Sequence, residues 1–177
     1  PNTVLVAVMH GNNEIGTIQD VKTLGSLCRS KGVLFFADGC QTFCHETFSI
    51  RDLPIDFMAL SGHKIRAPKG VGAVFIRKGL ELTPLLLGGK QERGLRPGTT
   101  PVELICAFAT ATEVWDAGVV ERMHHVRRYA IDQLKKNVRG LTINGLEAGT
   151  VLCHVLSFTV AGLHSKEVHR ELANLNV

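Results

Sequence analysis

The sequence predicts an α/β fold built on a mostly parallel sheet, and two observations carry that prediction. Residues 4–9 and 33–37 are continuous apolar runs rich in β-branched or aromatic side chains, which is typical of strands buried on both faces. Between them, apolar residues recur at helical spacing over 21–27, directly behind Asp20, a favourable helix cap. Alternation of strand, helix and strand is typical of a layered α/β fold.

The pattern continues along the chain and then changes in character. After Pro54, residues 57–60 and 71–76 predict two more strands, and the polar, Gly-rich residues 88–100 predict a loop long enough to be functional. The later elements are expected to be helices over 102–115 and 119–138, strands over 141–143 and 151–160, and a helix over 166–175. Because buried strands give way to amphipathic helices near Gly118, we place a domain boundary there, between residues 1–118 and 119–177.

Composition excludes several classes of protein. With 177 residues, 45% hydrophobic and 20% charged, the chain can form one globular domain, or one domain and part of another. The net charge of +4 is scattered along the sequence rather than concentrated in a stripe, which argues against a nucleic-acid surface. No apolar run approaches the roughly 18 residues that a membrane span needs.

The cysteines predict a reducing compartment. They are odd in number, contain no C-x-x-C pair and offer no convincing zinc ligand set, so we expect reduced thiols and a cytoplasmic protein. These cysteines are Cys28, Cys40, Cys44, Cys106 and Cys153. The chain runs from Pro1 directly into a strand and reaches Val177 without an obvious stop, so we also expect an internal fragment of a larger protein.

Polar residues follow three of the predicted strands at the point where each strand ends. They form the clusters 10–14, 38–41 and 61–64. Because ligands of open α/β sheets bind beyond the carboxyl ends of the strands, neighbouring strands would bring these clusters to one crevice.

Taken singly, these residues have ordinary structural explanations, since Asp38 could cap a turn and Lys64 could be a solvated amine. Taken together they match the needs of pyridoxal phosphate. That cofactor needs a lysine for a Schiff base and a carboxylate beside its ring nitrogen. It also needs small donors for its phosphate, which Ser61 and His63 would supply.

The order of these elements resembles the cysteine desulfurases, within the class V aminotransferase-like pyridoxal-phosphate enzymes. The matching stretches are MHGNNEIGTIQD at 9–20, FFADGCQ at 35–41, LSGHKIRAPKGVGAVFIR at 60–77 and GGKQERGLRPGT at 88–99. The resemblance implies the aspartate aminotransferase-like fold of pyridoxal-phosphate-dependent transferases. Residues 1–118 would then be the C-terminal part of the large domain, and 119–177 would begin a small α+β domain.

The resemblance also implies a role for each matching residue around the cofactor ring. Lys64 would be the catalytic residue, binding the cofactor as a Schiff base and then moving protons to and from the substrate. Asp38 would pair with the ring nitrogen, and Gln41 would donate a hydrogen bond to the phenolic oxygen. Asn13 would lie beside that oxygen and the substrate carboxylate.

Two further roles concern the cofactor phosphate. Ser61 and His63 would bind the phosphate within one subunit, whereas Thr99 in the long loop would reach the phosphate of the neighbouring subunit. The second role implies a two-fold homodimer. No residue is predicted to bind a metal.

The activity implied is conversion of L-cysteine to L-alanine, with the sulfur left as a persulfide on an enzyme cysteine. A sulfur-acceptor or scaffold protein would then receive it for iron–sulfur cluster or thio-cofactor biosynthesis. The attacking cysteine of the family would lie just beyond residue 177, so the fragment alone is expected to be inactive. Alternatives within the resemblance are selenocysteine lyase, another class V lyase or transaminase, and an inactive scaffold homologue.

Three departures from the family pattern fall inside the motifs. Arg66-Ala67 stands where Tyr-Gly is usual, Pro97 where Ser is usual, and Cys40 where a small residue is usual. We expect Cys40 to have a packing role. The cysteines expected to be small apolar residues of the core are Cys28, Cys106 and Cys153.

Overall fold

The computed structural model describes residues 2–145 and 149–176, and the chain divides into two compact units. The first unit comprises residues 1–10 and 19–115, and the second comprises residues 11–18 and 116–177. In the part of the chain that is described, no helix has both the length and the apolar character required to cross a membrane.

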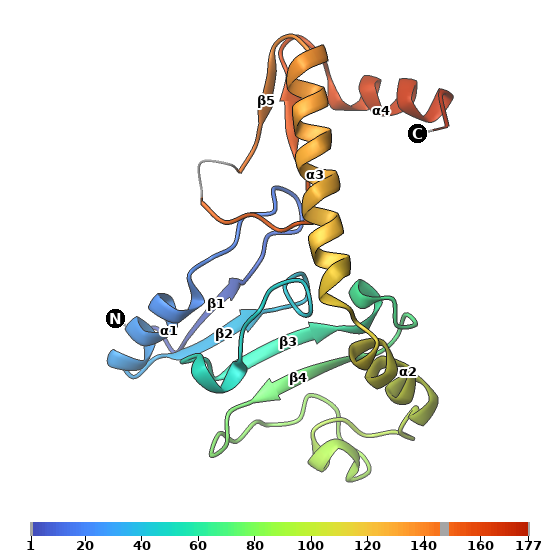
Figure 1. Cartoon of the computed structure of the whole chain (residues 1–177). Helices are drawn as coiled ribbons and strands as arrows, with labels where there is room; N and C mark the ends of the chain where they lie inside the picture. The colour runs from blue at the N-terminus through green and yellow to red at the C-terminus, as the bar shows by residue number, and fades with distance from the viewer. Residues whose placement is uncertain (1, 146–148, 177) are drawn as a thin grey trace. The chain divides into compact units, whose positions relative to one another are not determined.

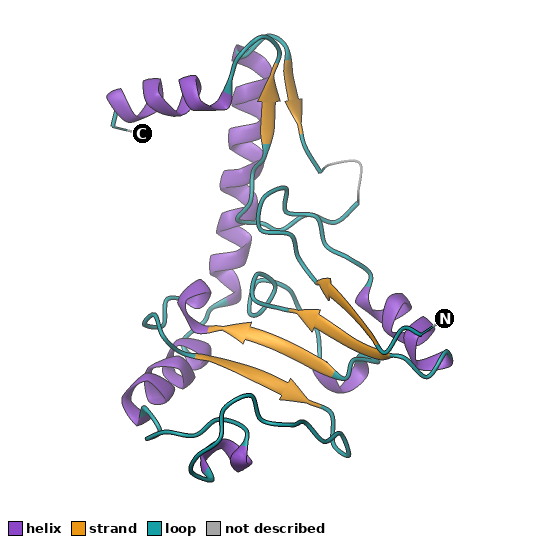
Figure 2. Ribbon diagram, turned by 180° about the vertical axis from the view of Figure 1, so that it is seen from behind, coloured by secondary structure: helices purple, strands orange, loops and turns teal. Residues whose placement is uncertain are grey.

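A four-stranded sheet forms the centre of the first unit (Figures 1 and 2). Its strands, in spatial order, are β1 (Leu5–Met9), β2 (Leu34–Asp38), β3 (Phe57–Ser61) and β4 (Gly72–Ile76). The first three strands run parallel and β4 runs antiparallel to β3. The predicted α/β fold with a mostly parallel sheet is therefore confirmed. Only residues 62–71 separate β3 from β4, which is shorter than the dozen or so residues that a parallel crossover needs.

The helix α1 (Val21–Ser30) connects β1 to β2 and packs on the sheet. Asp20 caps it as predicted, because its Oδ1 accepts the Thr23 backbone N–H at 3.0 Å. The helix buries Val21 and Cys28 in a core cluster with residues of β2 and β3. A Cβ atom at Gly25 would lie 2.4 Å from the Pro54 carbonyl oxygen, so this close approach requires glycine.

Three short 3-10 helices and one α-helix complete the first unit. They are η1 (Ile50–Asp52), η2 (Gly62–Ile65), η3 (Gln91–Gly94) and α2 (Val102–Glu113). The predicted loop over 88–100 contains η3 and leads into α2. Ala111 of α2 packs with Ile65 and Ala67 in a second buried cluster, which fixes the segment after β3 from one side.

The second unit is built on one long helix and a hairpin. It contains α3 (Ala117–Asn137), β5 (Leu141–Ile143), β6 (Phe158–Val160) and α4 (Ser165–Asn174). The two strands pair antiparallel, with Leu141 opposite Val160. The predicted helices over 119–138 and 166–175 and the strand over 141–143 are confirmed, with ends that agree to within two residues.

The strand predicted over 151–160 is wrong in its first part, because only Phe158–Val160 pair as a strand. Val151 forms an isolated bridge to Thr17. The Val155 carbonyl accepts the Arg127 Nε–H at 2.7 Å instead of a strand partner. Leu152 and Cys153 are buried, so the apolar residues that predicted a strand here lie in a buried turn.

Candidate functional site

Asp38 lies at the carboxyl end of β2, where its backbone joins three segments. Its carbonyl accepts the His10 N–H at 2.8 Å, and the next residue, Gly39, donates to the Ala59 carbonyl at 2.9 Å. The Asp38 carboxylate accepts the Cys40 backbone N–H at 2.9 Å. The carboxylate is therefore held at the edge of the sheet by its own turn and remains half-buried.

The next strand, β3, ends at Ser61, and η2 carries His63 and Lys64 directly after it. Ser61 Oγ and His63 Nδ1 are hydrogen-bonded at 2.8 Å. Arg66 closes the turn in the left-handed conformation, with φ of 70°. For a non-glycine residue that conformation costs about 1–2 kcal/mol, so the Arg66 departure falls at a strained position.

The charges of Asp38 and Lys64 converge on the thiol of Cys40. Burial, together with the hydrogen bond and the charge of Asp38, raises the pKa of that thiol to about 12, and the charge of Lys64 acts in the opposite direction. Both groups are thus within electrostatic reach of one side chain. The predicted carboxylate and amine therefore lie in the same neighbourhood, although 26 positions separate them in sequence (64 minus 38).

Gln41 is buried in the turn that follows Asp38. The turn is tied to the end of β2, because the backbone N–H groups of Thr42 and Phe43 both donate to the Gly39 carbonyl, at 3.1 and 2.9 Å. A rigid turn of this kind fixes the position of Gln41 relative to Asp38.

Two buried histidines beside this turn were not predicted as functional residues. His10 follows β1, and its Nδ1 is hydrogen-bonded to Thr42 Oγ1 at 2.9 Å. His45 lies against Trp115, with ring centroids 4.9 Å apart. Burial lowers the pKa of both imidazoles, and the charge of Lys64 also lowers that of His45. His10 belongs to a predicted polar cluster, whereas nothing in the sequence near His45 distinguishes it.

Asn13 and Thr99 are both exposed. Asn13 belongs to the second unit and is exposed in a turn, where the neighbouring Asn12 side chain accepts the Glu14 and Ile15 N–H groups at 2.9 Å. Thr99 is exposed in the segment between η3 and α2. The roles predicted for both residues stay predictions.

The expected burial of the cysteines is confirmed for two of three. Cys28 and Cys153 are buried, as expected of small apolar residues, but Cys106 of α2 is exposed. The prediction for Cys106 is therefore wrong. Helix α2 is apolar over much of its circumference, so its sequence pattern does not indicate which residues face outward.

The side chains gathered at this edge offer a carboxylate, a primary amine and a hydroxyl–imidazole pair. Such a set fits a phosphate ester carried on a basic ring with an aldehyde, because each functional group of that ligand finds a complementary one. Across residues 2–145 and 149–176, no three His, Cys, Asp or Glu side chains group closely enough to hold a metal ion.

Known proteins with similar sequences are cysteine desulfurases. The chain is 38% identical over 162 residues to the mitosomal cysteine desulfurase of Encephalitozoon cuniculi, which covers 89% of this chain and 38% of that protein. It is 42% identical over 138 residues to cysteine desulfurase IscS of Rickettsia massiliae, which covers 77% of this chain and 33% of that protein. The chain thus spans about a third of the length of these curated relatives.

Solved structures agree with the sequence comparison. A NifS-like protein matches 99% of the chain with a TM-score of 0.89 at 33% identity, and the match covers 49% of that protein. SspA in complex with cysteine matches 98% of the chain with a TM-score of 0.79 at 31% identity, covering 48% of that protein. The sequence pattern of the family described as aminotransferase class-V matches residues 1–177. Because this match spans the whole sequence, the chain belongs to the aminotransferase class-V family.

Proposed function

We propose that the protein containing this chain is a pyridoxal-phosphate-dependent cysteine desulfurase. The observation that carries the proposal is the convergence of Asp38 and Lys64 on Cys40 at the carboxyl edge of the sheet. The names of the similar proteins support the same activity. We propose L-cysteine as the substrate, with L-alanine as the product and the sulfur passed on as an enzyme persulfide.

The cofactor, when bound, supplies an electron sink that stabilises negative charge at the substrate Cα. Asp38 would hold the proton on the ring nitrogen, because a carboxylate beside it favours the charged form. Gln41 would orient the ring through a hydrogen bond to the phenolic oxygen. Ser61 and His63 would bind the phosphate with the hydroxyl and imidazole that already pair at 2.8 Å.

Lys64 would carry the proton between substrate atoms. Lys64 lies on η2, directly after His63. The same turn would therefore carry both the imidazole that binds the phosphate and the amine that moves protons. Asn13 would lie beside the phenolic oxygen of the cofactor and the substrate carboxylate.

The persulfide would form on a cysteine other than Cys40. A nucleophilic cysteine must be a thiolate, and a pKa of about 12 keeps the Cys40 thiol protonated near neutral pH. Cys28 and Cys153 are buried. We therefore propose that Cys40 packs beside the cofactor and that another cysteine of the full-length protein accepts the sulfur.

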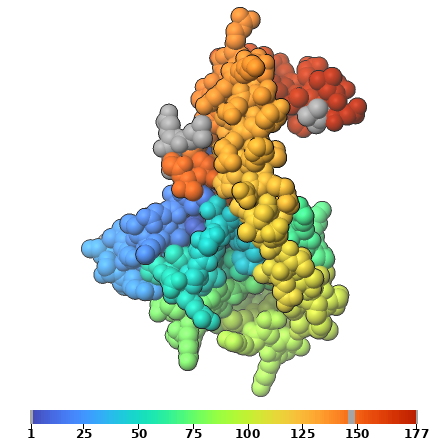
Figure 3. All heavy atoms as spheres, in the orientation of Figure 1, coloured from blue at the N-terminus to red at the C-terminus, as the bar shows by residue number. Residues whose placement is uncertain are grey.

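We further propose that the protein is a two-fold homodimer in which Thr99 binds the cofactor phosphate of the neighbouring subunit. Leu85, Leu86 and Leu87, in the segment before the Thr99 loop, are 96, 60 and 88% exposed. This segment, in light green, lies at the surface in Figure 3. Consecutive exposed leucines are typical of a surface covered by another chain, and a second copy is the occupant that the Thr99 role requires.

The remaining proposals concern the rest of the molecule. Residues 1–118 would belong to the large cofactor-binding domain and 119–177 to the start of the small domain. A sulfur-acceptor or scaffold protein would take the sulfur for iron–sulfur cluster or thio-cofactor biosynthesis. Free thiols at Cys28, Cys40, Cys44 and Cys106 are consistent with a reducing compartment such as the cytoplasm.

The test uses the full-length protein with a matched pair of lysine variants. Pyridoxal phosphate is added, borohydride reduces any bond it forms with an amine, and peptide mapping locates the label. We expect the label on Lys64, with Lys64→Ala abolishing both labelling and alanine release from L-cysteine. Lys69→Ala, which removes an exposed lysine five positions later, should change neither. Labelling of a different peptide, or labelling without alanine release, would contradict the proposed site or the proposed reaction respectively.

A further inference from the structure

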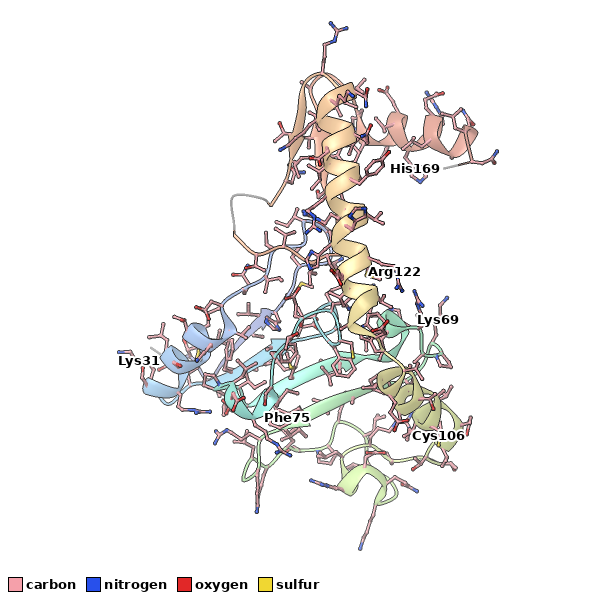
Figure 4. All side chains as sticks on the ribbon, viewed as in Figure 1. Lys31, Lys69, Phe75, Cys106, Arg122 and His169 are labelled. Carbon is pink, nitrogen blue, oxygen red and sulfur yellow. The ribbon has the colours of Figure 1, made fainter. Side chains whose placement is uncertain are left out.

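A pocket of about 300 Å³ lies in the first unit, away from the candidate site. Its walls come from α1, the segment 50–55 and the end of β4. Ser61 ends β3 three residues beyond Met58, the strand partner of the pocket residue Phe75, which is ~10 Å along the strand at a rise of ~3.3 Å per residue. Figure 4 shows Phe75, a pocket residue, towards one end of the sheet and Lys69 towards the other.

The charges that line this pocket are mostly positive. Lys22, Arg29, Arg51 and Arg77 contribute four cations, and Asp52 is the one carboxylate among the lining residues described. Lys22 and Arg29 stand seven positions apart on α1, so they lie on the same face of that helix. Even with Asp56, which pairs with Arg77, the pocket presents a local excess of cationic donors to a solute.

Arg77 is positioned before any ligand arrives. Its Nε donates to Asp56 Oδ1 at 2.6 Å, and Asp56 Oδ2 accepts the Phe35 backbone N–H at 2.8 Å. Asp56 is buried, and each of its carboxylate oxygens accepts one of these bonds. Because a guanidinium carries five N–H donors, this arrangement leaves the two terminal nitrogens of Arg77 to bind an acceptor.

We propose that this pocket binds a phosphoryl group, carried either by inorganic phosphate or by a compact phosphate monoester. Guanidinium forks match the geometry of phosphate oxygens and bind them in pairs. Pro54 and Phe75 add apolar wall, which would contact the organic part of a monoester. The site shares no residue with the proposed cofactor site, so it stands independently of the proposed desulfurase function.

The test measures binding of inorganic phosphate and of phenyl phosphate to the full-length protein by titration calorimetry at constant ionic strength. The test variant is Arg29→Gln/Arg51→Gln, which removes two exposed cations of the pocket. The matched control is Lys31→Gln, which removes an exposed cation just beyond α1 that does not line the pocket (Figure 4). All measurements are made in a Ser61→Ala/His63→Ala background, so that the probes do not bind at the phosphate donors proposed for the other site.

We expect saturable binding that weakens at least tenfold in the double arginine variant and changes less than twofold in Lys31→Gln. Tighter binding of phenyl phosphate than of phosphate would identify a monoester as the ligand, and equal binding would identify free phosphate. If the double variant fails to fold, Lys22→Gln tests the same pocket and should weaken binding severalfold. No saturable binding of either probe, or equal weakening by Lys31→Gln, would overturn the proposal.

Discussion

Asp56 links three strands of the sheet through its backbone and its carboxylate, and replacing it tests how the first unit is held together. Its N–H donates to the Phe35 carbonyl at 2.9 Å, and its own carbonyl accepts the Arg77 N–H at 2.8 Å. Its carboxylate accepts the Phe35 N–H at 2.8 Å and the Arg77 Nε–H at 2.6 Å. Asp56→Ala removes only the second pair of bonds, so the loss of stability reports on the carboxylate.

The structure gives the size of the expected effect. Phe35 is completely buried, and a buried N–H left without an acceptor costs about 1–3 kcal/mol. The Arg77 side chain is 45% exposed and can be hydrated when its partner is lost, so the ion pair adds at most about 1 kcal/mol. We therefore expect Asp56→Ala to lower the free energy of unfolding by about 2–3 kcal/mol.

Asp56→Asn separates the two contributions, because it keeps an amide oxygen for the Phe35 N–H and loses only the charge. We expect that variant to cost about 1 kcal/mol, close to the value for an exposed ion pair. Urea denaturation of the two variants and of wild type, followed by circular dichroism, measures the differences. A loss below about 0.5 kcal/mol in Asp56→Ala, or equal losses in the two variants, would refute the reasoning, since the cost of an unpaired Phe35 N–H is put at ~1 kcal/mol or more.

Three more predictions follow from the same structure. Gly25→Ala should destabilise the protein by about 1–3 kcal/mol in urea denaturation, although alanine has the better helix propensity. The reason is that the alanine Cβ would lie 2.4 Å from the Pro54 carbonyl oxygen. Unchanged stability would contradict this close approach. Burial lowers the pKa of His10 and His45 below 6.5, so the unfolded chain binds more protons at these two residues than the folded chain does. The stability of the protein should therefore fall as the pH drops below 6.5, and it should fall less in His10→Gln. Thermal melts that do not change between pH 7.5 and 5.5 would refute this. Iodoacetamide should alkylate exposed Cys106 far faster than Cys40, whose pKa is about 12. The variant Asp38→Asn should accelerate the alkylation of Cys40 alone. Equal alkylation rates at the two thiols in wild type would show that burial and Asp38 do not suppress the Cys40 thiolate.

Local sequence patterns could predict most of the first unit because its elements obey short-range rules. Each strand is a short apolar run between turn residues, and Asp20 is the N-cap residue at the start of α1. The carboxyl ends of parallel strands share one edge of a sheet, so polar residues that follow successive strands converge without any knowledge of the packing. For this reason Asp38, Ser61 and Lys64 could be grouped in advance.

The incorrect and the missing predictions have a different origin, because these features depend on contacts between segments that are distant in sequence. Residues 151–157 read as a strand since they are apolar, yet the Val155 carbonyl bonds to Arg127 of α3. Helix α2 buries Ala111 and exposes Cys106. Which face of this helix is buried depends on where the segment with Ile65 and Ala67 packs against it. His45 owes its altered pKa to burial and, in part, to Lys64, 19 positions away (64 minus 45).

Arg66 shows where a local rule and the fold disagree. A non-glycine residue at φ of 70° is locally unfavourable, so the surrounding contacts must hold it there. The next residue, Ala67, donates its N–H to the Gly62 carbonyl at 3.1 Å and is buried beside Ile65. These contacts close the turn that presents His63 and Lys64. The strain at Arg66 is therefore located in the turn that positions the proposed catalytic lysine, where stored backbone strain is most often found in proteins.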